Sequence, residues 1–353
     1  MGSLVSGSIK KCKSCGGNLV FSPSFQELVC NNCSSQSKIE KSKEYLKHDF
    51  SSGEATQKVN KFSGYAKCSN CGANVSLQDN ISGMCPYCDT AVVARVEDKD
   101  LNEPDFVVPF AFNKERASEL FVKNVKKKWF LPNKFKKAPQ IDKINGFYFP
   151  VCSFDENTNS TYDGKLAIDN HHTDSEGRTY TTTSYRLISG EKKLAFTDIM
   201  TETSSQMTQD ELGKIMPYDT RECFKFNQDF LRGYSLEYPN ESVQQLKKVA
   251  DNIIDSHIEN SILSNYHYDR VCYLKVNTTR QNEKYAFGAL PVYEFTLDYK
   301  DKPYKTLVNG QTGQIGGGLP KSKVKIAFLV IAILLVIGGI AVLAVLSEMG
   351  YFG

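Results

Sequence analysis

Residues Ile326 to Leu346 read IAFLVIAILLVIGGIAVLAVL, a stretch of 21 residues without a charged side chain. A helix rises about 1.5 Å per residue, so this stretch is long enough to cross a hydrocarbon layer of about 30 Å. It is apolar on every side, whereas a core helix of a soluble domain usually has a polar stripe. The sequence therefore predicts one C-terminal transmembrane helix over residues 326–346.

The charges that flank this stretch predict its orientation. Lys321, Lys323 and Lys325 directly precede it, whereas residues 347–353 carry only Glu348. Because lysine accumulates on the cytoplasmic side of membrane helices, we expect cytoplasmic N-terminal domains and a short external C-terminal tail. Residues 1–7 lack the charged and apolar segments of a signal peptide, which agrees with a single-pass protein of the cell membrane.

Composition sets broad limits. A chain of 353 residues has room for two or three units, and its net charge of +3 does not indicate a nucleic-acid partner. Of 11 cysteines, eight form four C-x2-C pairs, while Cys152, Cys223 and Cys272 stand alone and are expected to be buried small side chains. The first six residues also match a short myristoylation pattern at Gly2, which can arise by chance.

The first two cysteine pairs predict a zinc ribbon over residues 9–37. They enclose two short apolar runs, residues 18–21 and 25–29, which are joined by the turn Ser22-Pro23-Ser24. A second copy is predicted over residues 65–95, with strands near Val75–Leu77 and Ile81–Met84. Two residues between cysteines allow one tight turn to bring both sulfur atoms to one metal.

Both ribbons are expected to hold one structural Zn²⁺, because four thiolates leave no coordination position for water or substrate. Iron or redox chemistry is the alternative for such cysteines, but neither ribbon is followed by a strand–helix–strand pattern. The predicted ligands are Cys12, Cys15, Cys30, Cys33, Cys68, Cys71, Cys85 and Cys88.

Between the ribbons, residues 38–64 are rich in Lys, Ser and Gln, and they predict a flexible linker. Residues 105–319 are the only unit large enough for a substantial core, and they predict an α+β domain with an antiparallel sheet. A similar order of motifs around residues 149–165 and 290–302 suggests that this domain is a duplicated strand-helix-hairpin unit; chance similarity is the alternative. The predicted fold class is thus multidomain, with two small β zinc ribbons, this domain and one transmembrane helix.

Two helices are predicted inside the α+β domain. The first follows Asn113 as N-cap and ends near Trp129, and its Lys123, Lys126, Lys127 and Lys128 predict a solvated face rather than a binding patch. The second runs from Glu241 to about Leu263. Its expected apolar stripe consists of Val243, Leu246, Ala250, Ile253 and His257.

Four motifs carry a resemblance that extends over nearly the whole chain. They are the tandem Cys-x-x-Cys-Gly knuckles, the strand Phe106-Val107-Val108-Pro109-Phe110, the helix exit Lys128 to Pro132 and the closing segment Lys284 to Pro320. The chain resembles bacterial membrane proteins described as TFIIB-type, or primosomal-helicase-like, zinc ribbon proteins. The resemblance implies a role beside flotillin-like (SPFH) or phage-shock-type proteins in envelope stress.

Three classes of function were compared. An enzyme needs a convergent set of reactive groups, and the best candidate, residues 169–174 with His171 and His172, has the composition of an exposed loop. Nucleic-acid binding needs clustered positive charge, which the two ribbons lack; a membrane-tethered nucleic-acid-binding protein linked to replication stays the alternative. The sequence favours an adaptor that recruits protein partners to the membrane and has no enzymatic activity.

Overall fold

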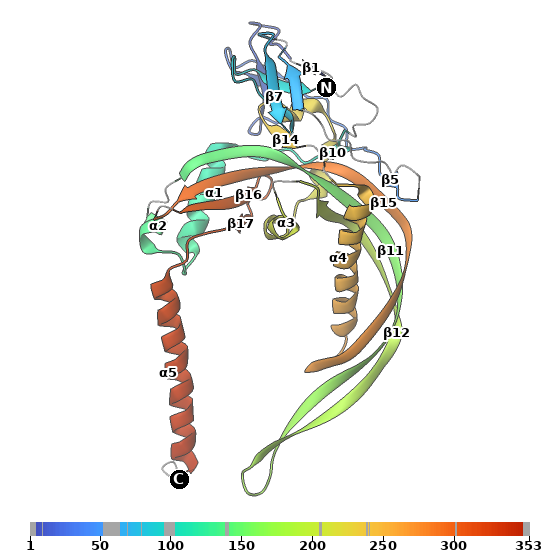
Figure 1. Cartoon of the computed structure of the whole chain (residues 1–353), viewed down its shortest axis with the longest axis vertical. Helices are drawn as coiled ribbons and strands as arrows, with labels where there is room; N and C mark the ends of the chain where they lie inside the picture. The colour runs from blue at the N-terminus through green and yellow to red at the C-terminus, as the bar shows by residue number, and fades with distance from the viewer. Residues whose placement is uncertain are drawn as a thin grey trace.

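Three long antiparallel strands form the centre of the molecule (Figure 1). β11 (Ile141–Thr173) pairs with β12 (Thr179–Glu202) on one side and with β15 (Arg270–Asp298) on the other. Their far halves leave the domain as a curved arm, which we define as residues 157–173, 179–197 and 270–281. The computed structural model describes residues 5–8, 10–51, 64–68, 70–78, 80–94, 103–137, 141–204, 207–237, 239, 241–300 and 302–348.

The domain contains two similar halves. In the first, β10 (Phe106–Val107) leads through α1 (Lys114–Lys127) and α2 (Asn133–Lys137) into β11; in the second, β14 (Ser235–Glu237) leads through α4 (Val243–Leu263) into β15. β10 lies parallel to β15, and β14 lies parallel to β11, so each half contributes its short strand to the long strand of the other half. This exchange has the symmetry expected of a duplicated unit, although a common origin of the halves stays a prediction.

The remaining elements extend the sheet or pack against it. β16 and β17 extend β15, α3 packs beneath them, and two short 3-10 turns lie before β14. Their bounds are α3 (Gln209–Ile215), η2 (Thr220–Glu222), β13 (Phe224–Lys225), η3 (Gln228–Leu231), β16 (Pro303–Asn309) and β17 (Ile315–Gly317).

Local sequence signals explain where the helices begin. The side chain of Asn113 accepts a hydrogen bond from Arg116 N, which confirms the predicted cap of α1. Ser242 and Gln245 form a capping box at the start of α4. The helix α4 covers the concave side of the arm (Figure 1), where Ile254 and Ile258 belong to the same buried cluster as Leu166 of β11.

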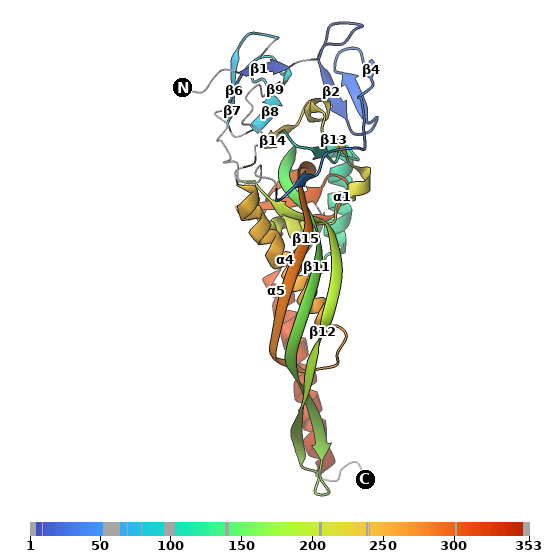
Figure 2. The ribbon, with the colours of Figure 1, turned by 90° about the vertical axis from the view of Figure 1, so that its right-hand side faces the viewer.

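The cysteine-rich part of the chain forms two modules at the end of the molecule opposite the C-terminal helix (Figures 1 and 2). Module 1 consists of residues 10–37, and module 2 consists of residues 5–8 and the described residues within 64–94. Module 1 has a three-stranded sheet, and module 2 has two hairpins joined by the first strand of the chain, which pairs with β6 and β9. The strands are β1 (Val5–Ser8), β2 (Leu19–Ser22), β3 (Glu27–Cys30), β4 (Gln36–Ser37), β6 (Gly64–Lys67), β7 (Asn74–Gln78), β8 (Asn80–Met84) and β9 (Ala91–Ala94). In the described residues β7 pairs with β6 and β8 with β9, so the two predicted strands do not form a hairpin with each other.

The beginning of the predicted linker is packed against the domain. β5 (His48–Asp49) pairs with Lys284 and Tyr285 of β15, and Lys47 forms ion pairs with Asp155 and Asp198 at 2.5 and 3.2 Å. Residues 38–51 therefore form a strap across the sheet instead of the expected flexible linker. The cause is tertiary: these polar side chains find partners on strands more than 100 positions away, which local composition does not reveal. Residues 52–63 lie outside the described part of the chain.

The C-terminal helix α5 (Lys323–Glu348) leaves the domain below α1 and α2 (Figure 1). Its segment Lys323–Leu343 is long and apolar enough to cross a membrane, and none of that segment is buried inside the protein. Large apolar side chains such as Phe328 and Leu335 are 73% and 71% exposed. The apolar stretch predicted from the sequence is thus a single continuous helix, and its side chains from Ile326 to Leu343 are exposed.

Candidate metal centres

Each module brings four cysteine sulfur atoms together. In module 1 the Sγ atoms of Cys12 and Cys33 lie 3.6 Å apart, and those of Cys15 and Cys30 lie 3.5 Å apart. In module 2 the corresponding pairs, Cys68 with Cys88 and Cys71 with Cys85, both lie 3.7 Å apart. Within each group all four ligand atoms lie within 4.8 Å of one another, so each group could hold one metal ion.

The same backbone turn occurs at all four cysteine pairs. The fourth residue after the first cysteine of each pair has a positive φ, and its N–H donates to the carbonyl of that cysteine at 2.8 to 3.0 Å. These residues are Gly16, Ser34, Gly72 and Asp89. The sequence revealed the two glycines, which adopt this conformation at little cost, but not Ser34 and Asp89. Metal coordination would provide a reason to hold non-glycine residues there.

Hydroxyl groups lie beside one exposed or half-buried sulfur in each module. Ser35 Oγ is 3.1 Å from Cys33 Sγ, and Thr90 Oγ1 is 3.2 Å from Cys88 Sγ. These hydroxyls are the largest influence on the pKa of each thiol and lower it to about 6. Both hydroxyls stand two residues after the last cysteine of their module, a pattern that the sequence prediction missed.

This donor set fits a closed metal site. Four thiolates at these separations can surround one ion tetrahedrally, and thiolate is the form that binds metal. Hydroxyl contacts lower the pKa of Cys33 and Cys88 toward that form, whereas the pKa of Cys15 and Cys71 is raised, against opposing backbone hydrogen bonds, by desolvation and the neighbouring thiols. In each group the first cysteine of each pair is buried, whereas the second is exposed or half-buried. Four sulfur ligands leave no open position, so the arrangement can stabilise a fold but offers no site for substrate.

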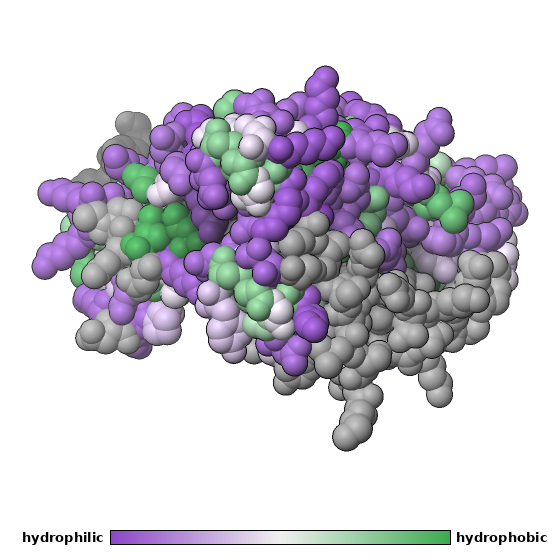
Figure 3. Space-filling model, turned by 90° about the horizontal axis from the view of Figure 1, so that it is seen from above, coloured by the Kyte–Doolittle hydropathy of each residue, from purple (hydrophilic) through white to green (hydrophobic). Residues whose placement is uncertain are grey.

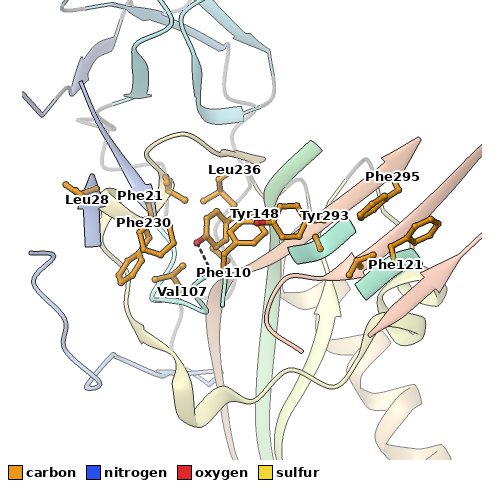
Figure 4. Packing of buried hydrophobic residues seen from close by; sticks show 14 of the residues in the cluster. Phe21, Leu28, Val107, Phe110, Phe121, Tyr148, Phe230, Leu236, Tyr293 and Phe295 are labelled. Atoms are coloured by element: carbon orange, nitrogen blue, oxygen red, sulfur yellow. Dashed lines mark hydrogen bonds between the residues drawn. The ribbon is translucent and has the colours of Figure 1, made fainter. Parts of the chain in front are cut away.

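Module 1 shares its hydrophobic core with the domain. The ring of Phe21 lies 5.3 Å from that of Phe230, and Phe21 N donates to Arg232 O at 2.8 Å. Figure 4 shows Phe21 and Leu28 beside Phe230 and Val107, in one cluster that continues to the central rings of the domain. Module 1 therefore shares the hydrophobic core of the domain and is not a separate unit on a flexible linker.

Module 2 touches both module 1 and the domain. Asn18 Nδ2 of module 1 donates to Thr90 Oγ1 at 2.8 Å, and Lys11 Nζ donates to Asn70 Oδ1 at 2.6 Å. Ser82 of β8 pairs with Leu236 of β14. Ile81 and Val93 of module 2 belong to the core cluster of the domain, whereas Val75 and Leu77 belong to a small separate cluster. The two candidate metal centres thus lie in modules that contact each other.

The other residues that the sequence singled out are spread over the molecule. Lys325 Nζ donates to Trp129 O and Leu131 O at 2.9 and 3.0 Å, whereas Lys321 and Lys323 are exposed. The pair His171 and His172 lies at the end of β11, so the predicted loop is strand.

Both histidines contact threonines of the neighbouring strand β12: His171 Nδ1 lies 3.0 Å from the hydroxyl oxygen of Thr181, and His172 Nε2 lies 2.8 Å from that of Thr182. Of the lone cysteines, Cys152 and Cys223 are buried as predicted, but Cys272 is exposed on the arm. None of these three cysteines belongs to either group of four cysteines. Among the described residues, those two groups are the candidate metal sites.

Comparison with known proteins finds a relative that is similar over most of its length. The chain is 29% identical to "Uncharacterized protein YdjG" of Bacillus subtilis (strain 168) over 323 residues, which cover 90% of this chain and 91% of that protein. No family model matches the chain, and no solved structure matches it. The similarity therefore covers most of both chains, but it carries no function with it.

Proposed function

We propose that this protein is a single-pass membrane adaptor without enzymatic activity, whose cytoplasmic domains hold two structural Zn²⁺ ions and recruit protein partners to the bilayer. The resemblance of the sequence to double zinc ribbon proteins suggests flotillin-like (SPFH) or phage-shock-type partners. The observation that carries this proposal is the arrangement along the molecule, with the cysteine modules at one end and the exposed apolar helix α5 at the other (Figure 1).

In this proposal each metal ion stabilises the fold of its module and takes no part in catalysis. Thiolate ligands and tetrahedral geometry suit zinc, whereas a catalytic zinc site keeps a position for water. Because Phe21 and Leu28 of module 1 pack in the core of the domain, a metal ion in module 1 would also stabilise that core. The modules then present rigid surfaces to a partner, which lowers the entropy cost of binding.

The membrane anchor requires a change of direction at the start of α5. Both views show the tip of the arm at the level of the C-terminal end of α5 (Figures 1 and 2). A flat bilayer around α5 would enclose this tip, where Asp174 and Arg178 form an ion pair, and ionic groups are expensive to place in hydrocarbon. We infer that in the membrane α5 turns away from the arm at residues 318–322, just before its first turn.

The end that carries the modules offers small contact surfaces. Seen from that end, the drawn surface is mostly hydrophilic, with small separate hydrophobic patches (Figure 3). Phe25 of module 1 and Tyr87 of module 2 are 57% and 73% exposed. Exposed aromatic side chains on a rigid support are typical anchors of protein interfaces. We assign the partner contact to this end of the molecule.

The decisive experiment follows a fluorescent flotillin-like protein in cells that produce the full chain. We expect it to concentrate at the membrane with the unaltered chain and to spread into the cytosol with the double variant Phe25→Ser and Tyr87→Ser. The matched control is Tyr185→Ser, because Tyr185 is 60% exposed but lies on the arm. Deleting residues 1–104 would be a poorer test, since it removes part of the shared core.

Persistence of the partner at the membrane with the double variant would count against recruitment by the modules. The replication-linked alternative makes a different prediction, namely binding of single-stranded DNA that weakens steeply with salt. Measuring DNA binding by the same purified chain separates the two functions.

A further inference from the structure

The loop between α1 and α2 exposes two aromatic side chains beside the start of α5. Trp129 and Phe130 are 52% and 41% exposed, and their rings lie 5.0 Å apart in an edge-to-face arrangement. The neighbouring side chains of Leu131 and Phe135 are buried, so the loop is fixed to the core while its aromatic pair points outward. This is unusual for a solvated surface, where large aromatic groups cost free energy in water.

Lysine is concentrated in the two segments that contain and adjoin this aromatic pair, and Lys325 Nζ lies 5.9 Å from the centre of the Trp129 ring. Residues 123–137 carry seven lysines and residues 321–325 carry three, and neither segment contains an acidic residue. The acidic residues of α1, Glu115 and Glu119, lie in its first half, and Glu119 pairs with Arg116 at 2.7 Å. The nearby turn at residues 298–302 has two aspartates and two lysines and adds no net charge. The ten lysines are Lys123, Lys126, Lys127, Lys128, Lys134, Lys136, Lys137, Lys321, Lys323 and Lys325.

The loop is joined directly to the first residues of the membrane helix. Ser322 N donates to Phe130 O at 2.8 Å. Lys325 Nζ donates to Trp129 O, to Leu131 O and to Asn133 Oδ1 at 2.9, 3.0 and 2.7 Å. These contacts place the loop at the base of α5. A turn of α5 at residues 318–322 would rearrange them, but that short connection keeps the loop close to the first turn of α5 and hence near the membrane surface.

We propose that this surface, defined by Trp129, Phe130 and the ten lysines, is a binding site for anionic phospholipid headgroups. Tryptophan is enriched at membrane interfaces, and lysine clusters beside a membrane helix attract anionic lipids. Docking of the surface fixes the orientation of the cytoplasmic domain and therefore the height of the modules above the bilayer. The inference rests on the proposed membrane anchor and replaces the solvated lysine face predicted from the sequence.

The test uses the only tryptophan of the chain, which is Trp129. The full chain is reconstituted into vesicles of phosphatidylcholine, alone or with phosphatidylglycerol, and Trp129 fluorescence is measured with lipids that are brominated on the acyl chain. We expect emission to shift to shorter wavelength and quenching to increase when phosphatidylglycerol is present. Added salt should reduce both effects, because it screens exposed charges.

The variant Lys126→Gln, Lys127→Gln and Lys128→Gln should shift the ratio of docked to undocked protein by about fivefold per lysine toward the undocked state. The matched control removes three exposed lysines elsewhere, Lys193, Lys275 and Lys284, and should behave like the unaltered chain. Quenching that ignores phosphatidylglycerol, or that the variant leaves unchanged, overturns the lipid site.

Washing the vesicles with alkaline carbonate separates this failure from failure of the anchor. Protein that stays in the vesicles but shows lipid-independent Trp129 fluorescence overturns only the headgroup site. Protein that is released by the wash overturns both the anchor and the site that depends on it.

Discussion

The Nζ atom of Lys247 lies 2.6 Å from Oε2 of Glu156, and both side chains are almost fully buried between α4 and β11. Asp251 and Glu283 also contact Lys247, and Arg280 lies 3.1 Å from Glu156 Oε1. Burial raises the pKa of Glu156 although the bond from Lys247 opposes the increase. The network therefore joins α4 to the arm at a cost in desolvation that only its complete set of partners offsets.

Removal of one partner should be far more damaging than removal of both. We expect Lys247→Met to lower the free energy of unfolding by about 3 to 5 kcal/mol, since it leaves Glu156 buried without its closest cation. The double variant Lys247→Met and Glu156→Met should recover most of this loss. Thermal or chemical unfolding in detergent measures both, and a double variant as unstable as the single one would contradict the explanation.

A second carboxyl group should make stability depend on pH. Burial raises the pKa of Glu202 to about 7, and the neighbouring Glu241 and Glu237 add to the increase, although Ser204 N opposes it by donating a hydrogen bond. The folded protein thus binds a proton that the unfolded chain, with a carboxyl pKa near 4.5, releases. Stability contributed by this group is complete below about pH 4.5 and is lost as pH rises through about 7.

Glu202→Gln should remove this contribution, so that the stability of the protein changes less with pH between 4.5 and 7. The control is Glu191→Gln, because Glu191 is exposed on the arm. Melting temperatures across this range measure the effect. An unchanged slope in the Glu202 variant would show that other groups govern the pH response.

The sequence predicts the elements whose signals are local. The four C-x2-C turns, the cap of α1 at Asn113 and the apolar run of α5 need only neighbouring residues to be recognised. The second predicted helix is also present as α4, but its buried stripe continues through Ile254 and Ile258 rather than Ile253 and His257. Lys247 belongs to that stripe because Glu156 neutralises it, and a pattern of apolar residues alone excludes a lysine.

The sequence did not reveal that the strands of the arm are continuous or that residues 38–51 form a strap, and both have a tertiary cause. Polar residues such as Asn157 and Thr161 on β11 form one solvated face of a ribbon, so the long strand lacks a continuous apolar signal. The strap depends on pairing of His48 with Tyr285, which lies 237 positions away. Distant pairings of this kind follow from the assembled sheet and leave no mark in local composition.

The two metal centres should differ in their effect on the domain. Cys15 and Cys71 are equivalent exposed candidate ligands. The buried apolar residues of module 1 belong to the core cluster of the domain, whereas module 2 contributes only Ile81 and Val93 to that cluster and keeps a separate core of its own. Each serine substitution should reduce the zinc content from two ions to one per chain. We expect Cys15→Ser to lower the melting temperature of the whole domain, and Cys71→Ser to leave the main transition nearly unchanged.

Elemental analysis and scanning calorimetry of the purified chain test this pair. The comparison is matched because both cysteines are the second of their pair and both side chains are exposed. Equal losses in melting temperature would mean that module 2 is as tightly coupled to the domain as module 1. Fewer than two zinc ions in the unaltered chain would contradict the metal assignment itself.

The hydroxyl of Thr90 should strengthen metal binding in module 2. It lies 3.2 Å from Cys88 Sγ in a site where Thr90 is 1% exposed. Loss of a group that bonds to a metal ligand typically weakens metal affinity about 10- to 100-fold. Thr90→Val keeps the shape of the side chain and removes its hydroxyl, so we expect a loss of this size when zinc is titrated against a chelator.

The control for this prediction is Asn18→Ala, because Asn18 Nδ2 also donates to Thr90 Oγ1. That variant removes this one of the contacts between the modules but keeps the hydroxyl beside Cys88, so zinc affinity should fall much less. Ser35→Ala should reproduce the loss in module 1, where Ser35 Oγ lies 3.1 Å from Cys33 Sγ. If Asn18→Ala weakens zinc as much as Thr90→Val, the contact between modules, and not the hydroxyl, supports the metal.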